Sequence, residues 1–87
     1  MKITNTAVVG NVESNDLMII INPGEGLTLN IESSVYEQFG SSIESIIREE
    51  LANAEVTDAN VQVEYKGAFD FTIRARVKTA IRRASAN

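Results

Sequence analysis

The sequence predicts an α+β fold, a two-layer sandwich in which a mixed four-stranded sheet carries two helices on one face, in the order β-β-β-α-β-α. Three observations support this prediction. Short segments with strand patterns come first, a long segment with helical periodicity follows, and a further strand and helix complete the chain. No linker or internal repeat interrupts the 87 residues, so we expect one domain over residues 1–87.

The first third of the chain contains three expected strands. Residues 6–12 are compatible with a strand, and residues 17–21 are almost wholly apolar, which is typical of a strand at the centre of a sheet or covered on both faces. Residues 27–32 alternate between apolar and polar side chains, so one face of this strand should be buried. The side chains of that face are Leu27, Leu29 and Ile31.

A tight turn is expected at Asn22-Pro23-Gly24-Glu25. Proline presets φ at the second position and glycine supplies positive φ at the third, which is the pattern of a type II turn. We expect this turn to join the second and third strands as a hairpin.

The first helix should begin at residues 33–34 and end near Ala54. Ser34 and Glu37 have the spacing of a capping box, in which a hydroxyl and a carboxylate each satisfy a free backbone N–H. An apolar stripe with helical spacing should face the sheet. It consists of Val35, Phe39, Ile43, Ile46, Ile47, Leu51 and Ala54.

Residues 61–65 alternate again and predict a fourth strand. A helix separates this strand from the third, so the two should be parallel with a right-handed connection. The last helix should start near residues 68–70, with Asp70 as its cap. Its predicted core side consists of Ile73, Val77, Ala80, Ile81 and Ala84.

Basic residues flank the apolar stripe of the last helix. Arg74, Lys78 and Arg82 recur every fourth residue on one side, and Arg76 and Arg83 lie on the other. We interpret them as a solvated rim whose aliphatic stems cover the core. The alternative is that they dock an acidic partner or an anionic ligand.

The composition excludes most self-contained catalysis. The chain has no Cys and no His, so it lacks a thiol nucleophile, an imidazole base and the soft ligands of zinc or iron–sulfur sites. Glu49 and Glu50 diverge on a helix and are interpreted as solvated charges. Ser14 lies between Glu13 and Asp16 in a polar turn, where the residues alone favour a turn former. We expect a carrier, binder or subunit with no catalytic residue and no metal site.

Charge is distributed unevenly along the chain. Residues 1–65 sum to −9 and residues 66–87 to +5, giving the total of −4. An acidic body disfavours nucleic acids and anionic membranes as partners, although the basic end keeps a small interaction module as an alternative. The most apolar run, residues 17–21, is far shorter than the ~20 residues of a membrane span, so we expect a cytoplasmic protein.

Three segments, in order, resemble the acyl carrier protein (gamma chain) of bacterial citrate lyase. They are residues 6–18 with Glu13-Ser14-Asn15-Asp16, residues 33–40 with Ser-Ser-Val and Gln-Phe-Gly, and residues 66–76 with Lys-Gly-Ala-Phe-Asp. The resemblance extends from the start of the chain to about residue 84. Carriers of malonate decarboxylase are the nearest alternative. The common four-helix acyl carriers are dissimilar, because here Ser14 lies between strands.

The resemblance implies a noncatalytic carrier. Ser14 would be esterified through a phosphodiester to phosphoribosyl-dephospho-coenzyme A, whose thiol carries acetyl and then citryl. The implied partners are a prosthetic-group transferase, the alpha subunit that exchanges acetyl for citrate, and the beta subunit that cleaves the citryl thioester to oxaloacetate. Glu13 and Asp16 would help the transferase to recognise the serine, although Asp16 could equally stabilise the turn.

Five further residues lie in or beside the third of these segments. We hypothesise that some of Lys66, Arg74 and Arg76 contact the anionic arm or an acidic subunit surface. Phe69 and Phe71 stand where the family pattern has Leu and Cys, a difference that we expect to concern packing alone. The residues disfavour a freestanding hydrolase that uses Ser14, because the chain has no histidine to activate the hydroxyl.

Overall fold

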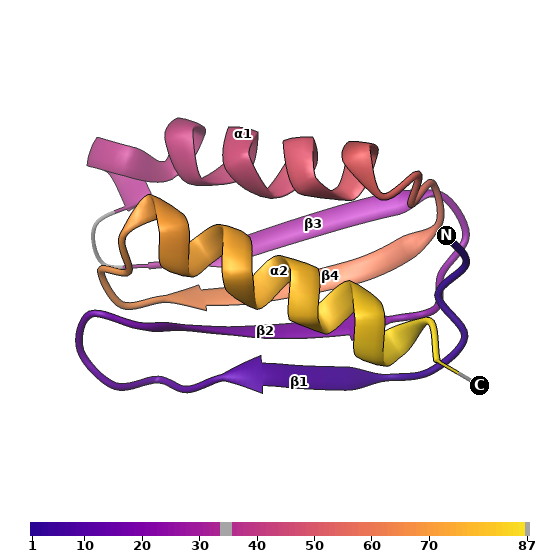
Figure 1. Cartoon of the computed structure of the whole chain (residues 1–87). Coiled ribbons are helices and arrows are strands. Elements are labelled where there is room, and N and C mark those ends of the chain that lie inside the picture. The colour runs from indigo at the N-terminus through magenta and orange to yellow at the C-terminus, as the bar shows by residue number, and fades with distance from the viewer. Residues whose placement is uncertain (34–35, 87) are drawn as a thin grey trace.

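The computed structural model describes residues 1–33 and 36–86, and within these the side chains of all residues except 36–41. The element order and the fold class are as predicted, with one mixed sheet and both helices over the same face (Figure 1). The elements are β1 (Ala7–Gly10), β2 (Leu17–Asn22), β3 (Leu27–Glu32), α1 (Tyr36–Asn53), β4 (Ala59–Tyr65) and α2 (Asp70–Ala84).

The strands lie in the order β1-β2-β4-β3. Strand β2 pairs antiparallel with both β1 and β4, with Leu17 opposite Tyr65, whereas β3 and β4 are parallel. The parallel pairing across the first helix is therefore confirmed. The apolar strand β2 lies inside the sheet as predicted, since it has a neighbour on each edge.

The predicted hairpin between the second and third strands is wrong, because β4 lies between them. The connection between β2 and β3 passes over the start of β4. A Cβ on Gly24 would lie 2.9 Å from Oδ1 of Asn60. The Ala59 N–H donates to the carbonyl of Gly26 at 2.9 Å. Positive φ falls on Gly26 (71°) and not on Gly24, so the type II turn is wrong as well. Strands are spaced about 4.8 Å apart, and four connecting residues suffice to step across one extra strand.

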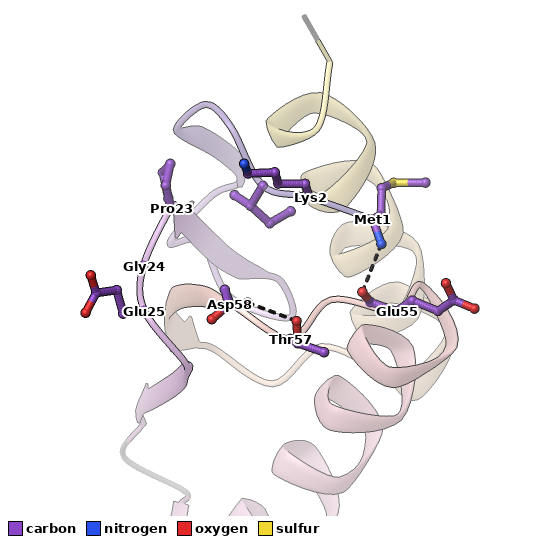
Figure 2. A pocket seen from close by; sticks show the side chains of 9 residues that line it. Met1, Lys2, Pro23, Gly24, Glu25, Glu55, Thr57 and Asp58 are labelled. Atoms are coloured by element: carbon purple, nitrogen blue, oxygen red, sulfur yellow. Dashed lines mark hydrogen bonds between the residues drawn. The ribbon is translucent and has the colours of Figure 1, made fainter.

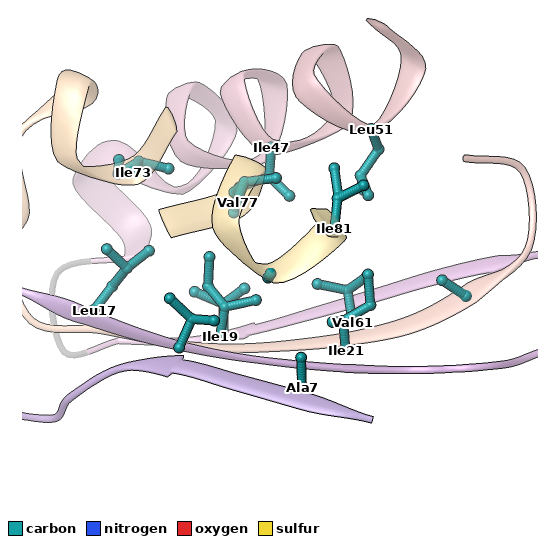
Figure 3. Packing of buried hydrophobic residues seen from close by; sticks show 14 of the residues in the cluster. Ala7, Leu17, Ile19, Ile21, Ile47, Leu51, Val61, Ile73, Val77 and Ile81 are labelled. Atoms are coloured by element: carbon teal, nitrogen blue, oxygen red, sulfur yellow. The ribbon is translucent and has the colours of Figure 1, made fainter. Parts of the chain in front are cut away.

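The core lies between the helices and the inner face of the sheet (Figure 3). Leu17, Ile19 and Ile21 of β2 are almost completely buried there. The apolar face of β3 is only half-buried, which corrects the expectation of a buried face. The helices contribute Ile43, Ile46, Ile47, Leu51, Ile73, Val77, Ala80, Ile81 and Ala84, as the periodicity predicts.

The helix ends differ from the predictions in detail. The expected capping box uses Ser34, which lies outside the described residues, as does Val35. Helix α1 ends at Asn53, and Glu55 then takes a φ of 58°. The N-cap position of α2 is Phe69, whose side chain makes no capping hydrogen bond. The prediction of Asp70 as the cap is therefore wrong. Asp70 is the first helical residue, where its carboxylate interacts favourably with the positive end of the helix dipole.

None of the helices in the described part of the chain is long and apolar enough to cross a bilayer.

Gly10 ends β1 at a point of close backbone contact. Its φ is 88°, and a Cβ there would lie 2.0 Å from the carbonyl oxygen of Leu17. The next residue, Asn11, donates its N–H to that same oxygen at 3.2 Å. Only glycine fits this position, which starts the connection that carries Ser14.

We predict that Gly10→Ala destabilises the domain by on the order of 3 kcal/mol or more, because the methyl group would overlap backbone and the left-handed φ would be strained. Gly26→Ala is the matched control. It has a φ of 71° but no atom within 4 Å of its Cβ, so it should cost only about 1–2 kcal/mol. Urea unfolding of both variants measures the difference. Equal losses would show that the close contact with Leu17 does not matter.

Candidate attachment site

Ser14 occupies a tight turn between β1 and β2. The Asp16 N–H donates to the Glu13 carbonyl at 3.3 Å, which makes Ser14 and Asn15 the two central residues of the turn. Asn15 takes a φ of 66°, a conformation that asparagine tolerates better than most residues. The Glu13 N–H donates to Oδ1 of Asn11 at 2.9 Å. The turn is therefore defined by its own hydrogen bonds.

The end of β4 holds the turn against the sheet. The Asn15 N–H donates to the Lys66 carbonyl at 2.7 Å, and the Lys66 N–H donates to the Asp16 carbonyl at 2.9 Å. These two bonds continue the β2–β4 ladder past Leu17 and Tyr65. Because they use backbone groups, the position of the turn does not depend on a flexible side chain.

A side-chain ion pair fixes the turn to helix α2. The Arg76 guanidinium donates from Nε to Oδ1 of Asp16 at 3.2 Å and from Nη2 to Oδ2 at 3.1 Å. The Leu17 N–H also donates to Oδ1 at 2.8 Å. The hydrogen bond from Arg76, helped by that from Leu17, holds the pKa of Asp16 below its ordinary value, against the opposing effect of partial burial. These contacts give Asp16 the role of stabilising the turn, which the sequence left as the alternative to recognition by a transferase.

The predicted attachment residue is accessible. Ser14 is exposed, and its hydroxyl makes no hydrogen bond within residues 1–33 and 36–86. Glu13 is exposed as well, and its carboxylate forms no ion pair with the described side chains. Ser14 thus offers a free hydroxyl at the tip of an anchored turn.

The residues around Ser14 lack the usual partners of a catalytic serine. The chain has no histidine or cysteine, and the Asp16 carboxylate is occupied by Arg76 and Leu17. The described residues contain no group of three or more side chains able to hold a metal ion. Neither an imidazole nor the Asp16 carboxylate is therefore available to activate the Ser14 hydroxyl.

The structure brings only some of the predicted residues together. Lys66 adjoins the turn through its backbone, and its exposed ammonium forms no ion pair among the described residues. Arg74 lies elsewhere, between the two helices, where Nη1 donates to Glu50 and Nη2 to Glu49, each at 3.0 Å. These bonds, Glu50 first and then Glu49, raise the pKa of Arg74 above its ordinary value. Neither contact was expected from the sequence.

The interpretation of Glu49 and Glu50 as diverging, solvated charges is wrong for Glu50; Glu49 is solvated, with 57% of its side chain exposed, but does not diverge from Glu50. Glu50 is buried, with 6% of its side chain exposed, and both carboxylates converge on Arg74. The Lys78 ammonium also lies 4.0 Å from Oε2 of Glu50. Part of the basic rim that was predicted to be solvated on α2 therefore forms ion pairs with carboxylates of α1. Periodicity could not reveal this, because the partner carboxylates belong to another helix.

Two exposed aromatic residues follow Lys66 in the chain. Phe69 and Phe71 are 65% and 73% exposed, which contradicts the expectation that they concern packing. Their rings stack on each other with centroids 5.9 Å apart and an interplanar angle of 15°. Just before them, the buried Tyr65 hydroxyl donates to the Ala68 carbonyl at 2.7 Å. Burial, and to a lesser degree the charge of Asp70, raises the pKa of Tyr65.

A hollow of about 580 Å³ lies at the other end of β2, away from Ser14 (Figure 2). Its lining includes Met1, Lys2 and Asp58, and none of the predicted site residues. Asp58 accepts the Gly26 N–H at 2.7 Å, which, together with the hydroxyl of Thr57, lowers its pKa. These contacts hold the β2–β3 connection in place and give this hollow a structural explanation.

Comparison with known proteins places the chain among acyl carriers. Residues 4–84 match the family model described as malonate decarboxylase delta subunit (MdcD). Citrate lyase acyl carrier proteins are similar over 98% of this chain: that of Haemophilus influenzae (strain PittEE) is 49% identical with 90% of its length covered, and that of Treponema denticola is 46% identical with 98% covered. A chain in the crystal structure of a Pseudomonas malonate decarboxylase hetero-tetramer in complex with malonate shares the fold. Its TM-score is 0.82 at 22% identity, over 95% of this chain and 87% of that one.

We predict that Asp16→Asn lowers the free energy of unfolding at pH 7 by about 1 kcal/mol, because the Arg76 guanidinium loses its charged acceptor. The folded-state pKa of Asp16 lies below its ordinary value of 3.8. Its stabilisation is therefore complete above about pH 4 and is lost as the pH falls through the folded-state pKa.

Urea unfolding at pH 7 and at pH 3 tests this prediction. The gap between wild type and Asp16→Asn should narrow at pH 3. Glu13→Gln removes a neighbouring carboxylate that forms no ion pair with described residues, and it should leave stability unchanged at both pH values. A gap that is absent at pH 7, or equally large at pH 3, would contradict the role given to the Asp16–Arg76 pair.

Proposed function

Since this chain belongs to the family of citrate lyase acyl carrier proteins, we propose that it carries acetyl and citryl groups for citrate cleavage, on a phosphoribosyl-dephospho-coenzyme A arm attached to Ser14. The proposed partners are the alpha and beta subunits of citrate lyase and a prosthetic-group transferase, all in the cytoplasm. The observation that carries this proposal is the exposed, unbonded Ser14 hydroxyl at the tip of an anchored turn.

The residues around Ser14 fit such an attachment. No described side chain occupies the hydroxyl, and Asn15 and Asp16 are held by Lys66 and Arg76, so a group on Ser14 would not disturb the core. When bound, the arm supplies a thiol, and a thioester stabilises the enolate formed in citrate cleavage far better than a carboxylate does. The chain itself contributes the fixed point from which this thiol is presented, which raises its effective concentration at successive active sites.

Attachment uses Ser14 as the nucleophile. The Ser14 Oγ forms a bond to the phosphorus of a phosphoanhydride donor, while the anhydride P–O bond breaks and its phosphate leaving group departs with the electron pair. The hydroxyl proton passes to a base on the transferase, because this chain has no histidine or cysteine beside Ser14. Asp16 does not serve as this base, since its pKa is lowered and its oxygens accept from Arg76.

The other predicted residues divide into three roles. We propose that Glu13 and Lys66, both exposed beside the turn, contribute to recognition of the arm or the transferase. Asp16 and Arg76 position the turn through their ion pair. A partner-binding role for Arg74 would compete with its bonds to Glu49 and Glu50, so it is the least favoured of the three cations.

A malonate decarboxylase carrier is the second candidate. The description of the matching family model and the likeness to a chain of a malonate decarboxylase complex favour it. The same Ser14 attachment would then serve a malonyl thioester. Purification of the chain with its partner subunits, followed by assays with citrate and with malonate, distinguishes the two: oxaloacetate from citrate supports the first candidate, and carbon dioxide from malonate the second.

Thiol titration of the Ser14→Ala variant tests the attachment. The chain has no cysteine, so every titratable thiol must come from an added group. After co-expression with the transferase and removal of the acyl group, wild type should show one thiol per chain and Ser14→Ala none. Ser45→Ala removes another exposed serine, on α1, and should keep one thiol.

Intact mass provides the independent readout. The mass added to wild type and to Ser45→Ala should match the arm joined through a phosphodiester. Ser14→Ala that still gains this mass, or Ser45→Ala that loses it, would disprove Ser14 as the attachment residue.

A further inference from the structure

The stacked pair of Phe69 and Phe71 is an unusual use of aromatic residues in this chain. The whole sequence has three Phe, two Tyr and no Trp, yet these two rings remain 65% and 73% exposed. They lie at the start of a 15-residue helix whose inner face is packed on the sheet. The rings also support each other by stacking. They form a preorganised apolar projection, which loses little side-chain entropy on binding.

This projection lies close to Ser14. The turn is hydrogen-bonded to Lys66, and a Cβ on Gly67 would lie 3.8 Å from Cα of Asn15. Ser14 adjoins Asn15, and Phe69 follows Gly67 by two residues. The limits of chain extension then place the Cα atoms of Ser14 and Phe69 at most about 16 Å apart. Lys66, whose side chain is exposed, bonds to the turn through its backbone and directly precedes Gly67.

An enzyme that modifies Ser14 must cover this region. A specific protein interface buries about 800 Å² on each partner, the area of a disc roughly 16 Å in radius. The transferase has to bring phosphorus within bonding distance of the Ser14 Oγ, so its interface surrounds the turn. Enzymes that act on a distant thiol at the end of a long arm have no such requirement.

We propose that Phe69 and Phe71 are the main docking contact for the transferase that attaches the arm, with Lys66 at the rim; this inference rests on the proposed function. The pair occupies an apolar recess beside the transferase active site and so strengthens binding of the unmodified carrier to this enzyme. Exposed aromatic anchors surrounded by polar groups are the residues that most often dominate protein interfaces.

The kinetics of arm transfer test this proposal. The substrates are the full unmodified chain and its Phe69→Ser/Phe71→Ser variant. The citrate lyase prosthetic-group transferase attaches the arm from its activated donor, and intact mass is measured over time. We expect KM for the variant to rise at least tenfold while kcat changes little, because docking is lost and the reacting groups are intact. Phe69→Tyr/Phe71→Tyr keeps both rings and should keep a KM near that of wild type.

Val8→Ser is the matched control. Val8 is a similarly exposed apolar residue (55%) on β1, and its substitution should leave KM unchanged. Circular dichroism and urea unfolding verify that all variants fold.

The outcomes distinguish failure of the proposed carrier function from failure of the proposed docking role. A wild-type chain that gains no mass overturns the proposed function and this inference with it. If wild type accepts the arm and Phe69→Ser/Phe71→Ser has the same KM, the docking role alone is overturned. The same conclusion holds if this variant accepts the arm normally and only its later turnover by the lyase subunits falls. An equal rise of KM in Val8→Ser also overturns it, because the effect would then be general to exposed apolar residues.

Discussion

The antiparallel pairing of β4 with β2 brings two distant parts of the sequence together at one end of the sheet (Figure 1). Because Leu17 lies opposite Tyr65, the next residues of both strands meet beyond the sheet, and Lys66 bonds to Asn15 and Asp16 through its backbone. Helix α2 starts shortly afterwards and delivers Arg76 to Asp16. The anchoring of the Ser14 turn is therefore a consequence of strand order, and the side chains reinforce it.

The same arrangement explains how the charge of the chain is used. The basic last helix faces the acidic body, and three of its cations lie within ion-pair distance of carboxylates, as Arg76 does with Asp16. Exposed pairs of this kind contribute little individually. Glu50 differs because it is buried, and its carboxylate needs Arg74 to offset the loss of water. The uneven charge of the sequence is thus partly an internal complement, which weakens the interpretation of the helix as a nucleic-acid surface.

The proposed carrier combines a rigid base with a borrowed reactive group. A domain this small, without cysteine or histidine, cannot enclose a catalytic centre of its own. It can hold one serine at a fixed point while partner proteins supply the base, the thiol and the active sites. Rigidity at Ser14 matters most during attachment, when an enzyme must meet the residue itself. The exposed aromatic pair lies where that encounter takes place.

The sequence by itself determined the type and order of the elements, the core faces and the serine turn, because these depend on local periodicity and turn chemistry. It could not determine strand order. Pro23 and Gly24 indicated a hairpin, but β4 gains more burial and two hydrogen-bonded neighbours by lying between β2 and β3. Likewise, the partners of Asp16, Glu50 and Arg74 became visible only in the tertiary structure. Each of those ion pairs joins elements far apart in the chain, and their contacts depend on packing that no local pattern records.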